Sequence, residues 1–311
     1  MSRVPEAEAI ITAELVRGLL HEQHPDLATL PLVPAAEGWD NVVFRLGDEL
    51  AVRLPRRELA AGLVLSELRF VGSIAERTNV ALPVPVRRGR PGRGYPWDWS
   101  VYRWTEGTPG LEVPAPERGG VGELAGFLGV LHTAAPPEAP ENPFRGLHIG
   151  ALDGRVRERL DLVEHRPDHA RLVALWDRLS AAPAYDGPPV WVHGDLHPGN
   201  LLFALDGSLA GVIDFGDLCA GDPAVDLAVA WQLYPAPRRR EFVAAVHKAR
   251  PRDAATWERA AAWALNFGLL SVAIAGNDPA FATNGDFTLR ELLAEFSGAR
   301  SADRVTPAED A

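Results

Sequence analysis

The sequence predicts an α+β protein with two lobes: a small antiparallel sheet at the N-terminal end and a larger, mainly helical lobe after it. Short apolar runs separated by turns fill the first third of the chain, and helix-spaced apolar residues dominate from Val121 onward. Between them, residues 105–116 are rich in Gly, Pro and Thr, as in a hinge. We therefore expect an N-terminal lobe at 1–106, a helical lobe at 107–300 and a disordered tail at 301–311.

The elements of the first lobe follow from local apolar spacing. Ile10, Ile11, Leu15 and Leu19 recur at helical intervals and predict an amphipathic helix over 6–22. A second helix is expected over 58–76. Short runs bounded by turn residues predict strands over 41–46, 50–54, 82–87 and 99–104, in a sheet of about five strands.

The second lobe is expected to be helical except for one segment. Its apolar spacing predicts helices over 121–133, 151–180, 223–234, 237–248, 254–275 and 287–298. Residues 188–218 differ, because short apolar runs alternate there with loops rich in Gly, Asp, His and Pro. We expect short strands at 190–192, 200–203 and 211–213, which would hold those loops on rigid backbone.

The composition indicates which kinds of molecule the protein is suited to bind. The 31 Lys and Arg against 42 Asp and Glu give a net charge of -11, which disfavours nucleic acid and anionic lipid and favours a cationic small molecule. The same charge could simply keep the protein soluble. One cysteine excludes an internal disulfide, and the N-terminus has no basic-then-apolar signal pattern. We expect a soluble, cytoplasmic monomer or weak dimer without membrane or nucleic-acid partners.

Residues 190–226 carry the chemistry. His193-Gly194-Asp195 is followed by Asn200 and then by Asp214-Phe215-Gly216. Phosphoryl transfer needs a divalent metal on the phosphates, and magnesium prefers carboxylate and amide oxygens such as those of Asp214 and Asn200. Asp195 could accept the proton of an attacking hydroxyl as the catalytic base.

Other interpretations of these motifs remain open at this point. A lone Asp-Phe-Gly occurs by chance, and His193 with Asp195 could belong to a metal hydrolase. A buried structural role for His193, holding the loop, is the simpler expectation. The role of His197 is ambiguous.

The order and spacing H-x-D-x-x-x-x-N followed by D-F-G resembles the catalytic and metal loops of protein kinases. The variant with Gly194 after the histidine and His197-Pro198-Gly199 inside the loop resembles the aminoglycoside phosphotransferase and choline kinase-like family. This resemblance implies a protein-kinase-like fold, Mg²⁺, ATP or GTP as co-substrate, and an alcohol as acceptor. It also implies that Asp226 starts a helix and braces the catalytic loop.

The resemblance extends into the first lobe, which it implies binds the nucleotide. The turn at 38–41 would cover the phosphates. Arg53 occupies the strand position where the family usually has lysine, and Glu67 would be its ion-pair partner. The backbones of Arg103 and Thr105 would receive the base. The alternation of the strand would also permit Arg53 to face solvent.

Short strings such as AVRLPRR and LPVPV most resemble aminoglycoside 2''-phosphotransferases. The acceptor implied is an aminoglycoside, and the role antibiotic resistance. A metabolic or macrolide kinase of the same fold shares every motif, and a non-catalytic nucleotide-binding protein is kept open by Arg53. Acids in 151–180 and after 254 could bind a polycation, but surface helices normally carry such acids.

Overall fold

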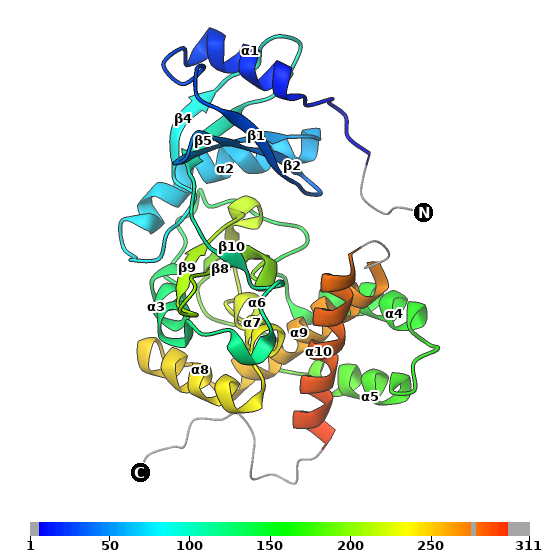
Figure 1. Ribbon diagram of the computed structural model, residues 1–311. Coiled ribbons are helices and arrows are strands. Elements are labelled where there is room, and N and C mark those ends of the chain that lie inside the picture. Colours follow the sequence, from blue (N-terminus) through cyan, green and yellow to red (C-terminus); the bar gives the residue numbers. More distant parts are fainter. Residues whose placement is uncertain (1–5, 275–277, 298–311) are drawn as a thin grey trace. The chain divides into compact units, whose positions relative to one another are not determined.

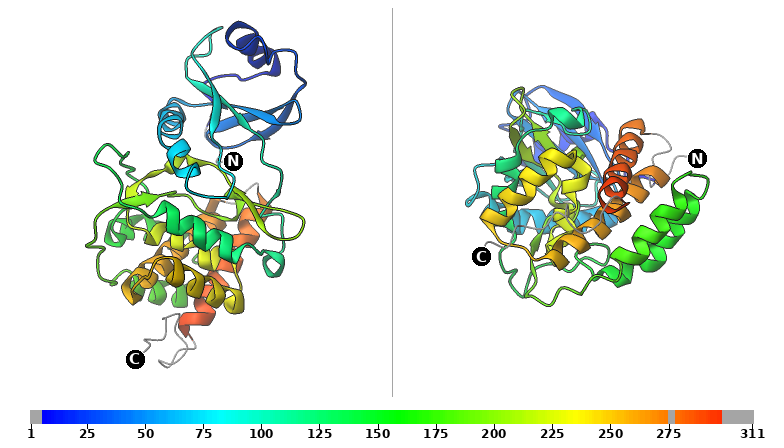
Figure 2. Two further views of the ribbon diagram at one scale, coloured as in Figure 1. Left: turned by 90° about the vertical axis from the view of Figure 1, so that its left-hand side faces the viewer. Right: turned by 90° about the horizontal axis from the view of Figure 1, so that it is seen from below.

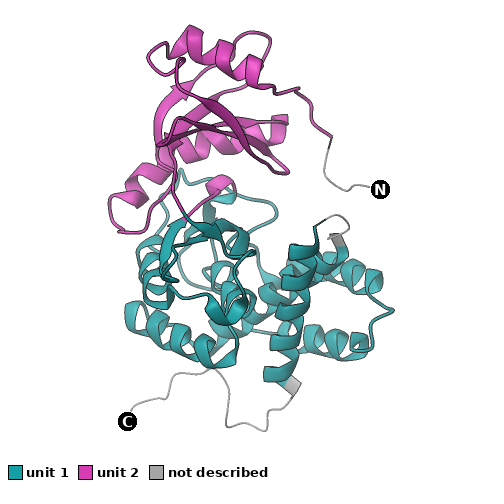
Figure 3. Cartoon of the chain, in the orientation of Figure 1, with its two compact units in different colours: residues 1–3, 107–211, 217–311 teal, residues 4–106, 212–216 magenta. Residues whose placement is uncertain are grey.

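The computed structural model describes residues 6–274 and 278–297. The chain divides into two compact units, coloured separately in Figure 3. The sheet unit consists of residues 4–106 together with 212–216, and the helical unit contains 107–211 and the chain from 217 onward. The sheet unit therefore includes the short segment that holds Asp214.

The sheet unit has one five-stranded antiparallel sheet in the order β1-β2-β3-β5-β4 (Figure 1). Its elements are α1 (Ala13–Gln23), β1 (Leu32–Glu37), β2 (Asn41–Leu46), β3 (Leu50–Pro55), α2 (Glu58–Ala75), β4 (Pro85–Gly89) and β5 (Trp99–Arg103). The predicted small antiparallel sheet with a long helix is confirmed.

The side chains of strand β3 point alternately to the two faces of the sheet. Val52 and Leu54 point into an apolar core that also contains Val16 and Leu19 of α1. Because successive side chains of a strand alternate between faces, Arg53 lies on the opposite face, toward α2. The alternation thus places a cation on the side of the sheet that α2 covers.

Two expectations for this unit were wrong in detail. The helix expected over 6–22 begins only at Ala13, because the side chain of Thr12 accepts a hydrogen bond from the backbone N–H of Leu15 and so caps the helix. Strand β1 was not predicted. It is an edge strand containing Pro34, most of its residues are exposed, and it lacks the apolar alternation of a half-buried strand.

The helical unit is built from helices around two small sheets, β10-β7 and β6-β8-β9. Its strands are β6 (Thr108–Pro109), β7 (Val190–Val192), β8 (Leu201–Phe203), β9 (Leu209–Val212) and β10 (Cys219–Gly221). Its α-helices are α3 (Val121–Leu131), α4 (Asp153–Leu162), α5 (His169–Leu179), α6 (Ala224–Leu227), α7 (Val229–Leu233), α8 (Ala236–Ala249), α9 (Ala254–Ile274) and α10 (Pro279–Ser297). Short 3₁₀ turns lie at Ala115–Glu117, Ile149–Leu152, Pro198–Asn200 and Phe215–Asp217.

Helix α9 lies at the centre of this unit. It packs along α10 and also contacts α4, α5, α6 and α7 (Figure 2). Trp176, Trp231 and Trp263 are fully buried in the resulting core. A large aromatic core of this kind gives the loops between the short strands a rigid base. Over the described ranges, no helix combines the length and apolar character that crossing a bilayer would need.

Several predicted boundaries of the helical unit are corrected. The helix expected over 151–180 is two helices, α4 and α5, because Pro167 cannot continue a helix between them. The segment 223–234 is likewise divided into α6 and α7. Helix α10 starts earlier than expected, at Pro279, and Asn200 belongs to a 3₁₀ turn before β8. The tail at 301–311 lies outside the described residues.

Candidate active site

The loop after β7 is held by a buried carboxylate from α6. Asp226, which is fully buried, accepts hydrogen bonds from the backbone N–H groups of His193 (2.8 Å) and Gly194 (2.9 Å). Its Oδ2 atom also lies 3.0 Å from Nε2 of His132. The brace that the family resemblance implied for Asp226 is therefore present.

Asp195 sits at the centre of this loop. Its backbone carbonyl accepts a hydrogen bond from Nδ2 of Asn200 at 2.9 Å, so the two predicted residues are joined within the helical unit. Its carboxylate Oδ1 accepts a hydrogen bond from Arg145 at 2.8 Å, and Oδ2 lies 3.6 Å from Nε2 of His197. The Nδ1 atom of His197 accepts the backbone N–H of Gly199, so Nε2 carries the ring proton and faces Asp195.

These partners keep Asp195 ionised. Burial alone would raise the pKa of its carboxyl, but the charge of Arg145 and the hydrogen bond from His197 hold the pKa well below its ordinary value. An ionised carboxylate can accept a hydrogen bond from an alcohol, whereas a protonated one would have to donate.

Gly194 explains why the loop can pass so close to its neighbours. It has φ of +83°, and a Cβ atom there would lie 2.7 Å from the carbonyl oxygen of Asp217 and 3.2 Å from Cβ of Arg145. Only glycine combines this backbone conformation with this space. The glycine between His193 and Asp195 is therefore required by packing.

A second group of predicted residues meets in the sheet unit. Arg53 donates to both carboxylate oxygens of Glu67 at 2.7 Å and to Oδ1 of Asp214 at 2.9 Å. The segment 212–216 is attached to this unit by a hydrogen bond from the N–H of Val212 to the carbonyl of Ala81. The predicted pairing of Arg53 with Glu67 is present.

Arg53 does not face solvent, so that alternative is wrong. Only 6% of Arg53 and 4% of Glu67 is exposed. Burial alone would lower the pKa of Arg53, but the carboxylates of Glu67 and Asp214 raise it above its ordinary value. The buried cation is thus permanently charged, and half of the Asp214 side chain remains accessible.

Asn200 and Asp214 have the donor atoms that magnesium requires. Because Nδ2 of Asn200 is used by the Asp195 carbonyl, its Oδ1 is the atom left to bind a cation. Asp214 is a non-glycine residue with φ of +62°, a conformation that aspartate tolerates better than most residues. In the part of the chain that the structure describes, no group of three or more His, Cys, Asp and Glu side chains forms a metal centre.

Ion pairs hold the turn that was expected to cover the phosphates. Arg56 pairs with Glu37 at 3.0 Å and donates to the carbonyl of Gly38, and Arg57 pairs with Asp40. Two cations that follow β3 are therefore already engaged with this turn. The positions predicted to receive a base through their backbone are Arg103, which ends β5, and Thr105, two residues further along the chain.

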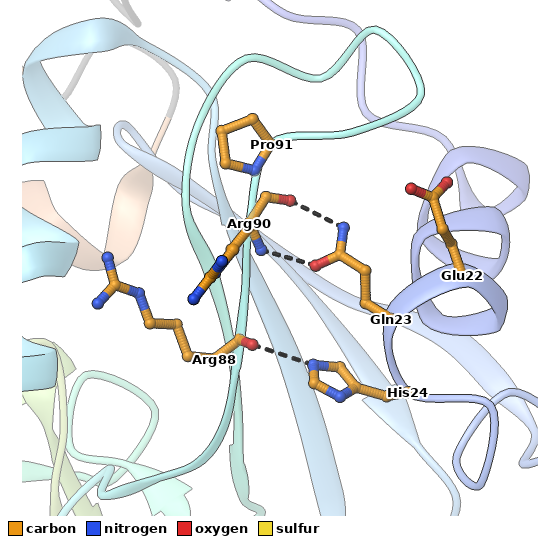
Figure 4. A pocket seen from close by; sticks show the side chains of 6 residues that line it. All are labelled: Glu22, Gln23, His24, Arg88, Arg90 and Pro91. Atoms are coloured by element: carbon orange, nitrogen blue, oxygen red, sulfur yellow. Dashed lines mark hydrogen bonds between the residues drawn. The ribbon is translucent and has the colours of Figure 1, made fainter.

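A pocket of about 380 Å³ in the sheet unit is separate from these groups. It is lined by Glu22, Gln23, His24, Arg88, Arg90 and Pro91 (Figure 4). Gln23 both donates to and accepts from the backbone of Arg90, and Nε2 of His24 lies 3.1 Å from the carbonyl of Arg88. The side chains here join α1 to β4, which is a structural role.

Sequence reasoning missed two side chains that touch the catalytic loop or its brace, and a third that pairs with one of them. Arg145 binds Asp195, Asp217 pairs with Arg145 at 3.2 Å, and His132 binds Asp226. Arg145 and His132 come from segments far from the motif, at no informative spacing. Asp217 directly follows the Asp-Phe-Gly triplet, so its position was the one available signal.

Comparison with known proteins agrees with this geometry. A family model described as the phosphotransferase enzyme family matches residues 31–263, which is most of the chain. No curated protein matches the sequence.

Three solved structures share the fold. The GDP complex of aminoglycoside 2'-phosphotransferase-IIIa has a TM-score of 0.68 at 19% identity, covering 92% of this chain and 100% of that chain. The GDP and kanamycin complex of APH(2'')-IIIa has a TM-score of 0.61 at 19% identity, with coverages of 90% and 98%. Macrolide 2'-phosphotransferase type I has a TM-score of 0.58 at 20% identity, with coverages of 89% and 98%.

At these identities the solved structures establish the protein-kinase-like fold alone, and the match to the family model establishes the family. The non-catalytic interpretation is therefore replaced by that of an enzyme. The chain belongs to the phosphotransferase enzyme family and is a phosphotransferase with an alcohol group as acceptor.

Proposed function

We propose that this enzyme transfers the terminal phosphoryl group of a magnesium-bound nucleotide, ATP or GTP, to a hydroxyl group of an aminoglycoside. The observation that carries the chemistry is the Asp195 carboxylate, held ionised on a braced loop beside Asn200. The neighbouring structures with GDP support a nucleotide co-substrate, and the one with kanamycin supports the acceptor. Antibiotic resistance would be the corresponding biological role.

Asp195 would act on the acceptor. Its carboxylate accepts the hydrogen bond of the attacking hydroxyl, orients the oxygen toward phosphorus and receives the proton as the new oxygen–phosphorus bond forms. The bond from that phosphorus to the bridging oxygen of the nucleotide breaks, and the nucleoside diphosphate leaves. Because phosphoryl transfer needs little covalent chemistry from the protein, the positions of the carboxylate and of the hydroxyl determine most of the rate.

The nucleotide would be held by the sheet unit. Arg53 would contact phosphate oxygens through its planar guanidinium while Glu67 fixes its orientation, and the backbones of Arg103 and Thr105 would bind the base. Oδ1 of Asn200 and the accessible carboxylate of Asp214 would hold Mg²⁺. When bound, the metal neutralises negative charge on the phosphates.

The acidic character of the chain supports a cationic acceptor. A net charge of -11 would attract a polycation at long range, and salt would weaken that attraction. The proposed acceptor should therefore bind more weakly as ionic strength rises.

One observation favours a second acceptor class, a neutral or anionic alcohol such as a sugar or a macrolide. Glu291 and Glu295, two of the acids available for a polycation, already pair with Arg239. Arg159 has no carboxylate at ion-pair distance among the described residues and donates to Oδ1 of Asn266. Burial and then the charges of Arg145 and Arg155 lower its pKa, although Glu158 opposes the effect. A guanidinium without a carboxylate partner would be available to a hydroxyl or an anionic group of an acceptor.

The test is a nucleotide-consumption assay with purified enzyme, magnesium and either ATP or GTP. The acceptors are several aminoglycosides, a macrolide, neutral sugars, an amino alcohol and a phosphorylated or carboxylated alcohol, each at low and high salt. We expect at least one aminoglycoside to stimulate turnover, with an apparent affinity that falls as salt rises. The Asp195→Asn variant, in which the base is lost at constant size, should be at least about a hundredfold slower.

The possible outcomes distinguish a wrong acceptor from a wrong reaction mechanism. Stimulation only by a neutral or anionic alcohol, independent of salt, would replace the aminoglycoside with the second class and leave the reaction unchanged. If no alcohol raised consumption above water hydrolysis, or if Asp195→Asn kept full activity, the proposed mechanism would be wrong.

A further inference from the structure

We propose that Arg145 is a positioning residue for the reaction, which orients the carboxylate of Asp195 for the acceptor hydroxyl. This inference rests on the proposed function. Arg145 lies in the segment between α3 and α4, outside every motif in the sequence. Its Nη2 atom donates to Oδ1 of Asp195 at 2.8 Å, and its Nε atom lies 3.2 Å from Oδ2 of Asp217.

The two aspartates give Arg145 a fixed direction. A planar guanidinium that binds two different carboxylates through two of its nitrogens cannot rotate without losing one of them. Its face also lies over the ring of Phe267 on α9, with 5.3 Å from the guanidinium carbon to the ring centroid. Only 18% of the side chain is exposed, so water competes little for these contacts.

The backbone under Arg145 is equally well fixed. Oδ1 of Asn142 accepts the backbone N–H groups of Phe144 (2.8 Å) and Arg145 (3.2 Å), and its Nδ2 donates to Asp217 at 2.7 Å. Gly146, with φ of +63°, packs against Gly221 of β10 so closely that a Cβ atom would lie 3.0 Å from the Gly221 Cα. The segment is thus joined to β10 and to Asp217 by its own hydrogen bonds and packing.

As a consequence, the two carboxylate oxygens of Asp195 have different hydrogen-bond partners. Oδ1 accepts the short hydrogen bond from Arg145 at 2.8 Å, whereas the contact between Oδ2 and Nε2 of His197 is longer and weaker, at 3.6 Å. Oδ2 is therefore the oxygen that accepts the acceptor hydroxyl. Arg145 sets the rotation of the carboxylate and so the direction in which Oδ2 points.

Another arginine of the helical unit also binds two aspartates but does not contact Asp195. Arg157 on α4 pairs with Asp153 and Asp177 at comparable distances, but on the surface and away from Asp195. It is a matched control, since its substitution also removes an arginine that binds two aspartates.

The experiment compares Arg145→Ala, Arg145→Lys and Arg157→Ala with the wild-type enzyme. Because a misplacement of about 1 Å can cost about a hundredfold in rate, we expect Arg145→Ala to lower kcat by roughly ten- to a hundredfold while KM for nucleotide is nearly unchanged. Arg145→Lys should recover part of kcat. A low, non-denaturing concentration of guanidinium should raise kcat of Arg145→Ala only, and Arg157→Ala should resemble the wild type.

A folded Arg145→Ala enzyme with wild-type kcat would overturn the inference and leave the proposed function intact. So would a loss of kcat in Arg145→Ala that neither lysine nor guanidinium restores. If the wild-type enzyme phosphorylates no alcohol, the proposed function fails, and crystal structures of wild type and Arg145→Ala decide the positioning role. An Asp195 carboxylate with the same rotation in Arg145→Ala crystals would then contradict it, and a displaced one would support it.

Discussion

At the scale of single residues, the contacts of Arg53 depend on its being arginine. The resemblance implies lysine at this strand position, a compact point charge on a flexible stem. Arginine instead binds both oxygens of Glu67 through one nitrogen and reaches Asp214 through the other. The guanidinium thereby links the α2 carboxylate to the Asp-Phe-Gly segment inside the sheet unit.

We expect Arg53→Ala to raise KM for nucleotide and to lower kcat, with partial recovery in Arg53→Lys. Because Glu67 would be left buried and unpaired, Arg53→Ala should also lose about 3–5 kcal/mol of unfolding free energy. Steady-state kinetics and urea denaturation measure the two effects. An Arg53→Ala enzyme with wild-type KM would show that another cation contacts the phosphates.

At the scale of elements, a buried hydrogen-bond relay formed by Arg252, His132 and Asp226 connects the end of α3 to the catalytic loop. His132 ends α3, and its Nε2 donates to Asp226 while its Nδ1 accepts from Arg252 at 2.9 Å. This arrangement uses the neutral ring. Burial lowers the pKa of His132, and Arg252 adds to the effect, although Asp226 opposes it.

The relay predicts a stability that depends on pH. Since the folded pKa of His132 is depressed below its unfolded value of about 6.5, its contribution is fully present above that value and is lost as pH falls. The unfolding free energy should therefore decline from pH 7 to pH 5, by at most about 1.4 kcal/mol per pH unit for this one proton. In His132→Gln the decline should be shallower, whereas the exposed control His21→Gln should follow the wild type. Identical slopes in all three proteins would contradict the relay.

At the scale of the whole molecule, binding of magnesium nucleotide should stabilise the fold by mass action. A ligand at a hundredfold excess over Kd adds about 2.7 kcal/mol to the unfolding free energy. We expect magnesium to increase the nucleotide-dependent shift in Tm of the wild-type protein. Asp214→Asn, in which the amide oxygen can still accept from Arg53, should lose the magnesium-dependent part.

Asp206→Asn is the matched control, because Asp206 accepts hydrogen bonds from Ser208 in an exposed turn and has no other side-chain partner among the described residues. It should shift as the wild type does. A folded Asp214→Asn protein with an unchanged magnesium dependence would remove Asp214 from the metal site.

The parts that sequence predicted well are those with a local physical signature. Short apolar runs bounded by turn residues identified most strands of the sheet unit, and helical spacing identified α2, α3, α8 and α9. Where one residue outweighed the pattern, prediction failed: Thr12 delayed the start of α1, and Pro167 divided the helix expected over 151–180. Edge strand β1 was missed because a strand without a buried face has no alternation to detect.

The sequence by itself determined the order and spacing of Asp195, Asn200 and Asp214, from which their chemistry was predicted. The brace at Asp226 and the pairing of Arg53 with Glu67 were implied by the family resemblance that those motifs carry. The tertiary structure alone decided which side chains complete the site. Arg145 reaches Asp195, and His132 reaches Asp226, across 50 and 94 residues of sequence. Such contacts depend on how loops fold back onto a helical core, and no local periodicity or propensity encodes them.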